Sequence, residues 1–290
     1  MAAKPIVAGT DGSEESLRAV GWAAREAALR GVPLRIVSAE EAPPGMITRA
    51  AAGEQQRVTD VLLGERDHAL TAAAERAAKV AAGVLIDTDV VTGSVDEAVT
   101  QAGSGALMLV LGSRGRGAFT ALLLGSVSRY AASHAPCPVV VIRDEPPSPH
   151  RLVGVGVADL DSCGDTLTFA FEEASLRQAS LLALHAWHTP ETEISRAGSG
   201  PHESGAEASA DAAGHLASLL DDWRAKYPGV QVSQEVVHGH PGRALVGLSA
   251  RADLVVIGRR ASHSDRPGRG SVRHALLNHA HGPVVTVPPA

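Results

Sequence analysis

The chain has 290 residues, of which 44% are hydrophobic and 20% are charged, a mixture typical of globular proteins and unlike that of disordered chains. Its formal net charge is −6 and its basic residues are scattered. The sequence therefore lacks the basic stripe that is typical of proteins that bind nucleic acid, and we expect no nucleic-acid partner. Every apolar run is far shorter than the roughly 20 residues needed to span a bilayer, so we expect no membrane association.

The start of the chain enters a strand-like apolar run directly and lacks the features of a signal peptide. The chain has two cysteines, Cys137 and Cys163. They cannot build a disulfide framework and show no metal-ligand spacing. We therefore expect a cytoplasmic protein.

Short β-branched runs alternate with alanine-rich stretches through the first half, as in a parallel sheet covered by helices. Five strands are predicted at Pro5–Thr10, Pro33–Ala39, Val84–Val91, Leu107–Gly112 and Pro138–Arg143. Helices are predicted near Ser13–Arg30, Gln55–Ala81, Val95–Gly103 and Gly125–His134. The strands are almost continuously apolar, which favours burial on both faces of the sheet.

A proline-rich linker, Asp144–His150, separates this half from a second half that repeats it. Three blocks recur after 145 or 146 residues: Ala106–Gly112 as Ala252–Gly258, Gly125–Val127 as Gly270–Val272, and Pro138–Val140 as Pro283–Val285. A nearly constant offset indicates duplication of one complete domain. We predict domains at residues 1–143 and 151–290, a division that also suits the length of the chain.

The second half is predicted to repeat the strands, at Leu152–Val157, Ser180–Ala186, Val230–Val237, Leu254–Gly258 and Val284–Val287. Residues Glu191–Ala206 are rich in glycine, serine and charge, and are predicted to form a mobile loop. The predicted fold class is α/β, with two tandem open five-stranded parallel sheets, each doubly wound with helices on both faces.

The most informative motif follows the fourth predicted strand. Gly112 and Gly115 come first, and after nine residues Gly125 and Ser126 open a helix. Ligands of open parallel sheets bind outside the carboxyl ends of the strands. Glycines let the backbone approach a phosphate, and the N–H groups of a helix N-terminus favour anions. The spacing therefore predicts a phosphate site, to which Ser126 adds a hydroxyl donor.

This spacing, G-x2-G-x9-G-S/T, resembles the ATP-binding branch of the universal stress protein family. The resemblance extends to Asp11-Gly12-Ser13 after the first strand and to the closing run Cys137–Val141. The internal repeat carries it into the second half, which gives the tandem form of the family. The fold that the resemblance implies is the adenine nucleotide alpha hydrolase-like one.

The resemblance also implies a ligand, ATP, alone or with Mg²⁺. Asp11 would face the adenosine, and the backbone of Ala39 would contact the adenine. The ribose and phosphate side would be lined by Leu111, Gly112, Arg114 and Gly115. The phosphates would be held by Gly125, Ser126, Val127 and Ser128. For Asp11 the alternative is a turn or helix-capping acid in Asp-Gly-Ser.

The second half departs from the pattern. Position 261, where the second glycine is expected, is alanine, and only eight residues separate it from Gly270. Val157 is aligned with Asp11, and Asp159 follows two residues later. Other motif positions are retained at Gly258, Arg260, Gly270 and Ser271. A second ATP site and a purely structural second half are both compatible with this sequence.

No P-loop pattern G-x4-G-K-S/T, no G-x-S-x-G and no H-E-x-x-H occurs, so we assign no catalytic residues. The leading hypothesis is a nucleotide-dependent stress-response regulator in which ATP orders the loop between Gly115 and Gly125. The first alternative is a non-catalytic scaffold in which the final strands, Val139–Ile142 and Val284–Val287, pair between the two halves or between two chains as a homodimer. The second is a slow ATPase. The protein partners are not predicted.

Overall fold

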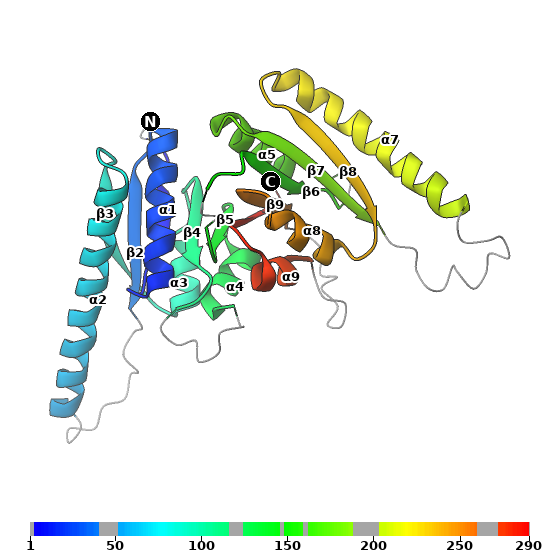
Figure 1. Cartoon of the computed structure of the whole chain (residues 1–290). Helices are drawn as coiled ribbons and strands as arrows, with labels where there is room; N and C mark the ends of the chain where they lie inside the picture. Colours follow the sequence, from blue (N-terminus) through cyan, green and yellow to red (C-terminus); the bar gives the residue numbers. More distant parts are fainter. Residues whose placement is uncertain are drawn as a thin grey trace, which may run out of the picture. The chain divides into compact units, whose positions relative to one another are not determined.

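The computed structural model in Figure 1 describes residues 3–40, 52–115, 124–145, 148–158, 162–187, 203–259 and 272–289, with the backbone alone over 52–63 and 203–208. The chain divides into two compact units, Met1–Arg143 and Asp144–Ala290. Among the described helices, none combines the length and apolarity needed to cross a membrane.

The first unit is built on five parallel strands. They are β1 (Ile6–Gly9), β2 (Leu34–Glu40), β3 (Ile86–Thr92), β4 (Met108–Gly112) and β5 (Val139–Ile142). Their order in the sheet is β3-β2-β1-β4-β5. The chain moves outward from β1 through β2 to β3, then crosses back to β4 on the other side of β1. The strand order therefore reverses between β1 and β4, where open α/β sheets place their ligands.

The helices of the first unit are α1 (Glu14–Arg30), α2 (Ala52–Val80), α3 (Val95–Gln101) and α4 (Ser126–His134). Helix α1 packs beside α2, and α3 packs beside α4. Right-handed crossovers place the first pair on one face of the sheet and the second pair on the other. Helices α1 and α4, which follow β1 and β4, therefore diverge to opposite faces at the reversal point.

The second unit repeats this plan. Its strands are β6 (Leu152–Gly156), β7 (Ser180–Trp187), β8 (Val232–His238), β9 (Leu254–Gly258) and β10 (Val284–Val287). They are parallel, in the order β8-β7-β6-β9-β10. Its helices are α5 (Gly164–Leu176), α7 (Glu203–Lys226), α8 (Pro241–Ser249) and α9 (Val272–His279). The predicted α/β fold class is confirmed.

All ten predicted strands are present, with ends that differ by no more than two residues. The predicted loop Glu191–Ala206 was too long, because α7 begins at Glu203 within an alanine-rich run that favours helix. Residues 191–202 of that loop lie outside the described residues.

Both units use the same packing devices. A β-carbon at Gly9 would lie 2.6 Å from Leu111 Cδ2, and one at the matching Gly156 would lie 2.9 Å from Leu245 Cδ1. Each first helix also contains a buried acidic residue paired with an arginine one turn later, Glu26 with Arg30 and Glu173 with Arg177. The duplication has therefore kept two features in each unit: a glycine in the first strand against which a leucine side chain packs, and a buried ion pair at the first helix.

Candidate functional site

Asp11 lies in the turn that leaves β1. Its Oδ1 accepts hydrogen bonds from the backbone N–H of Ser13 at 3.0 Å and from the Ser13 hydroxyl at 2.6 Å. The Ser13 hydroxyl oxygen caps α1 by accepting from the N–H of Ser16 at 3.3 Å, and Gly12 supplies the left-handed backbone of the turn with φ +80°. One carboxylate oxygen of Asp11 thus has the structural role of a turn acid.

The other carboxylate oxygen of Asp11 faces Gly115. A β-carbon at position 115 would overlap with Asp11 Oδ2, so any larger residue would displace the carboxylate. The loops after β1 and β4 are therefore in direct contact at the point where the strand order reverses.

Gly112 ends β4 between two helices. A β-carbon there would lie 2.9 Å from the backbone carbon and oxygen of Glu15 in the first turn of α1. On the other side, the buried Ser128 hydroxyl of α4 donates to the Gly112 carbonyl oxygen at 2.5 Å. Glycine is required at 112 because backbone packs on backbone, and Ser128 joins α4 to the end of β4.

Gly125 is different, because none of the described residues around it requires a glycine there. Its N–H donates to the Ser113 carbonyl oxygen at 2.8 Å. It caps α4 with φ −60° and ψ 149°, which any residue can adopt. A β-carbon would meet its nearest neighbour, the Ser113 oxygen, at an ordinary 3.5 Å.

The first turn of α4 presents its residues unequally. Ser126 is exposed, Val127 is half-buried and Ser128 is buried. The first N–H groups of a helix have no partner within the helix. Ser126 therefore offers both an accessible hydroxyl and a position at the positive end of the helix dipole, whereas the Ser128 hydroxyl is already used.

Arg114 lies beside the same loop. One guanidinium nitrogen, Nη2, is 3.5 Å from Glu15 Oε1, and the side chain is about one-quarter exposed at 28%. The arginine is thus held near the start of α1, with its charge partly balanced by an acidic neighbour.

Leu111 and Ala39 contribute less through their side chains. Leu111 is 4% exposed, and its side chain packs against Gly9 in the core. Ala39 lies on the neighbouring strand β2, half-buried and in register with Val91. Both residues lie at the carboxyl edge of the sheet. Because the side chain of Leu111 is buried, this residue can face a ligand only with its backbone. Residues 116–123 of the loop expected to respond to ATP lie outside the described residues.

In the second unit, the residue that takes the place of Asp11 is Ala158. Thr10 N–H donates to the Val37 carbonyl oxygen and Val157 N–H donates to the Leu184 carbonyl oxygen, both at 2.9 Å. Val157 therefore corresponds to Thr10, and the prediction that it matches Asp11 was wrong. The repeat offset of 146 residues, taken from the fourth strands of the two halves, is one residue too short for the first strands. Positions 159, 260, 261, 270 and 271 lie outside the described residues.

Aromatic and imidazole rings lie at this edge of the second sheet instead. His185 Nδ1 is 2.8 Å from the Val157 carbonyl oxygen, and the rings of Trp187 and His238 lie 4.6 Å apart at an angle of 57°. The sequence analysis assigned none of these three rings to a site. The presence of Trp187 and His185 at the end of the second strand, beside the first, was the available signal.

A sequence model of the universal stress protein family matches residues 2–143 and, a second time, residues 150–288. The chain belongs to this family. Both copies of the domain are recognised, so the tandem form that the sequence predicted is confirmed.

Universal stress proteins of Mycobacterium tuberculosis are similar over nearly the whole chain. Rv2005c is 35% identical over 97% of this chain and 95% of its own length. Rv2623 is 32% identical over 94% of this chain and 89% of its own length. A universal stress protein structure from Archaeoglobus fulgidus has a TM-score of 0.69 at 17% identity, covering 99% of this chain and 98% of that chain. The structural likeness supports the fold alone.

Proposed function

We propose that the first unit of this universal stress protein binds ATP and that occupancy of this site regulates a stress response. The observation that carries the proposal is Gly125. Among the described residues there is room for a side chain at this position, yet the sequence places glycine there as the N-cap of α4. A glycine that the protein does not need for its own geometry suits the close approach of a phosphate to the backbone.

The phosphates would bind at the N-terminus of α4. Ser126 would donate its exposed hydroxyl, and the backbone N–H groups of Gly125, Val127 and Ser128 are the donors expected from the family pattern. The Gly125 N–H already donates to Ser113 and the Ser128 hydroxyl to Gly112. Val127 and Ser128 would therefore act through their N–H groups, and Gly125 mainly through the space that it leaves.

The adenosine would lie nearer to β1 and β2. A carboxylate accepts hydrogen bonds from hydroxyl groups and repels phosphates, so Asp11 suits the ribose. Its Oδ2 faces the Gly115 backbone, and Gly112 and Arg114 follow on the same loop. The backbones of Ala39 and Leu111 would complete the base and ribose side of the site.

Mg²⁺ would arrive with the nucleotide. Within the described parts of the chain, no group of three or more His, Cys, Asp or Glu side chains could hold a metal ion. A cation at this site would therefore be bound mainly by the phosphate oxygens.

The proposed stoichiometry is one ATP per chain. Ala158 in place of Asp11 removes the carboxylate from the second unit, and its loop carries alanine at position 261 and is one residue shorter before Gly270.

The cytoplasmic location and the homodimer remain predictions. So does the slow ATPase, which would need multiple turnovers that are lost with Ser126→Ala.

The experiment combines mass spectrometry of nucleotide released from the purified protein with calorimetric titration of ATP and of cAMP, which lacks two of the phosphates. Gly125→Ala is expected to lower ATP affinity at least tenfold, about 1.4 kcal/mol. Its unfolding free energy should change by less than about 1 kcal/mol. Ser126→Ala should weaken ATP binding with even less effect on folding, because the side chain is exposed.

Two matched controls lie in the second unit. Gly164→Ala alters another helix-start glycine around which a β-carbon would meet no atom within 4 Å, and Ser271→Ala alters the repeat counterpart of Ser126. Both should bind ATP as the wild type does. If wild-type protein carries no nucleotide and shows no titration heat, or if Gly125→Ala binds ATP normally, the ATP proposal fails and the scaffold alternative gains support.

A further inference from the structure

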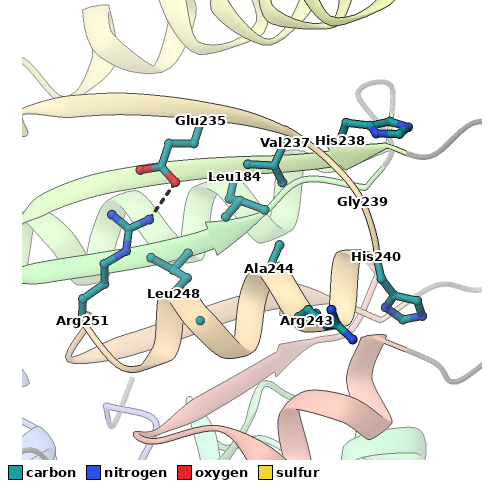
Figure 2. A pocket seen from close by; sticks show the side chains of 11 residues that line it. Leu184, Glu235, Val237, His238, Gly239, His240, Arg243, Ala244, Leu248 and Arg251 are labelled. Carbon is teal, nitrogen blue, oxygen red and sulfur yellow. Dashed lines mark hydrogen bonds and ion pairs between the residues drawn. The ribbon is translucent and has the colours of Figure 1, made fainter. Parts of the chain in front are cut away.

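The second unit contains a cavity of about 440 Å³ between helix α8 and strands β7 and β8 (Figure 2). It lies along the sheet face beneath α8, among residues that have no part in the proposed ATP site. Its volume is within the range of sites that hold small organic ligands.

The interior of the cavity is apolar. Figure 2 shows Leu184 and Val237 of the strands converging with Ala244 and Leu248 of α8. Gly247, three residues after Ala244 and therefore its neighbour on the helix surface, also lines the cavity. A β-carbon at Gly247 would meet no atom within 4 Å. The space beside this glycine is therefore open.

The ends of the cavity are charged. At one end, Arg251 Nη2 pairs with Glu235 Oε2 at 2.7 Å, which neutralises this arginine. At the other end lie Arg243 and His240 (Figure 2). Arg243 is exposed and forms no ion pair with another described residue. The lining thus has one positive charge in excess, at the end opposite the ion pair.

This positive charge is not a requirement of the fold. Gly93 and Gly239 hold matching turns before the third helix of each unit, with φ +139° and +146°. Counted from these glycines, Glu97 takes the place of Arg243 in the first unit, and Gly105 takes that of Arg251. Acidic residues are the stabilising choice in the first turn of a helix. An arginine in that turn of α8, beside an open apolar cavity, therefore favours an anionic occupant.

We propose that this cavity binds a small amphiphilic carboxylate. Its apolar chain would lie against Val237, Ala244 and Gly247, which are only partly buried or exposed, and removal of apolar surface from water would provide the main stabilisation. Its carboxylate would pair with Arg243, because a guanidinium binds a carboxylate through two parallel hydrogen bonds. Glu235 already holds Arg251, so the carboxylate binds at the Arg243 end.

The test is a calorimetric titration of the full chain with octanoate, compared with octylammonium, which has the same chain and the opposite charge. Octanoate is expected to bind at least tenfold more tightly than octylammonium. Arg243→Glu, which copies Glu97 of the first unit, should weaken octanoate binding at least tenfold. ATP affinity should not change in this variant, so failure here is distinguishable from failure of the ATP proposal.

A second variant fills the cavity. Gly247→Leu should abolish octanoate binding, and the helix should be kept because leucine is a better helix former than glycine. Gln101→Leu places the same side chain at the matching, exposed position of α3 and should bind octanoate normally. The proposal is overturned if octanoate does not bind wild-type protein, if octylammonium binds equally well, if Gly247→Leu binds normally, or if Gln101→Leu loses binding.

Discussion

The carboxyl edges of the two sheets have the same architecture and different side chains. In the first unit, Asp11 meets Gly115, and helix α4 is capped by Gly125, which no described residue crowds. In the second, Ala158 replaces the carboxylate, and His185 and Trp187 end the adjoining strand. The duplication has preserved the strands that carry a site while allowing the residues of the site to diverge.

A second difference lies one strand further out. Asp89 and Glu235 occupy the same position of their sheets, in register with Val37 and Leu184. Asp89 pairs across the sheet with Arg35, whereas Glu235 reaches over the cavity to Arg251 at the end of α8. The same acidic position is therefore part of the sheet surface in one unit and of a cavity mouth in the other.

The largest expected effect tests what the units share. Arg30→Met removes the guanidinium that pairs with Glu26, whose side chain is only 2% exposed. Arg177→Met removes the guanidinium that pairs with Glu173, whose side chain is 0% exposed. Each should destabilise its own unit by about 3 kcal/mol, because a buried charge loses its partner. Urea unfolding followed by peptide-resolved hydrogen exchange assigns the loss to one unit.

The matched control replaces both members of a pair. Glu173→Leu with Arg177→Met should recover much of the stability lost by Arg177→Met alone, since no charge is then left buried. A loss of similar size in the double variant would mean that the buried pair itself, rather than an uncompensated glutamate, stabilises the unit.

A smaller effect distinguishes the two fourth-strand glycines. Gly112→Ala should destabilise the first unit by about 1–3 kcal/mol, because the new carbon would press on the backbone of Glu15. Gly258→Ala should reduce the unfolding free energy by less. The nearest neighbour of its new β-carbon would be the Thr166 hydroxyl at 2.5 Å, and this side chain can rotate away, whereas backbone cannot. Equal losses in the same unfolding measurement would contradict the distinction.

The smallest effect concerns pH. The hydrogen bond from the Arg35 guanidinium holds the pKa of Asp89 below its ordinary value, although burial opposes this. A lowered folded-state pKa contributes stability above the unfolded pKa of about 3.9 and loses it as the pH falls through the folded value. The pair is more than one-third exposed, so Asp89→Asn should cost less than about 1 kcal/mol at pH 7.

The measurement is the difference in unfolding free energy between wild type and Asp89→Asn across a pH series. The difference should shrink steadily below about pH 4. A difference that stays constant down to pH 2 would show that the asparagine acts through packing instead of charge.

The fold was predictable because apolar strands and alanine-rich helices follow regular periods, and because the repeat supplied a second copy of each pattern. The family resemblance that the glycine spacing carries also assigned Asp11 and Gly115 to one site, and in the structure Asp11 faces Gly115. What the sequence could not supply was register. The hydrogen bond from the Val157 N–H to the Leu184 carbonyl oxygen depends on packing over the whole sheet. A one-residue error in the alignment of this strand matched Val157, instead of Ala158, with Asp11.

The cavity was equally hidden from sequence reasoning. Leu184 lies on β7, Glu235 on β8 and Arg251 just after α8, and only the folded chain brings them to one space. The difference between Gly112 and Gly125 was hidden as well. Both are motif glycines, and their roles separate only when the atoms around each are known.

The bond from the Ser128 hydroxyl to the Gly112 carbonyl oxygen has a dynamic consequence. It joins the helix expected to bind phosphate to a strand end that packs directly on the first turn of α1. Rigidity gained at α4 would spread along this short connection. Amide protons in the first turn of α1 should therefore exchange more slowly when ATP is bound, and Ser128→Ala should reduce this protection, with the remainder transmitted from Asp11 through Ser13.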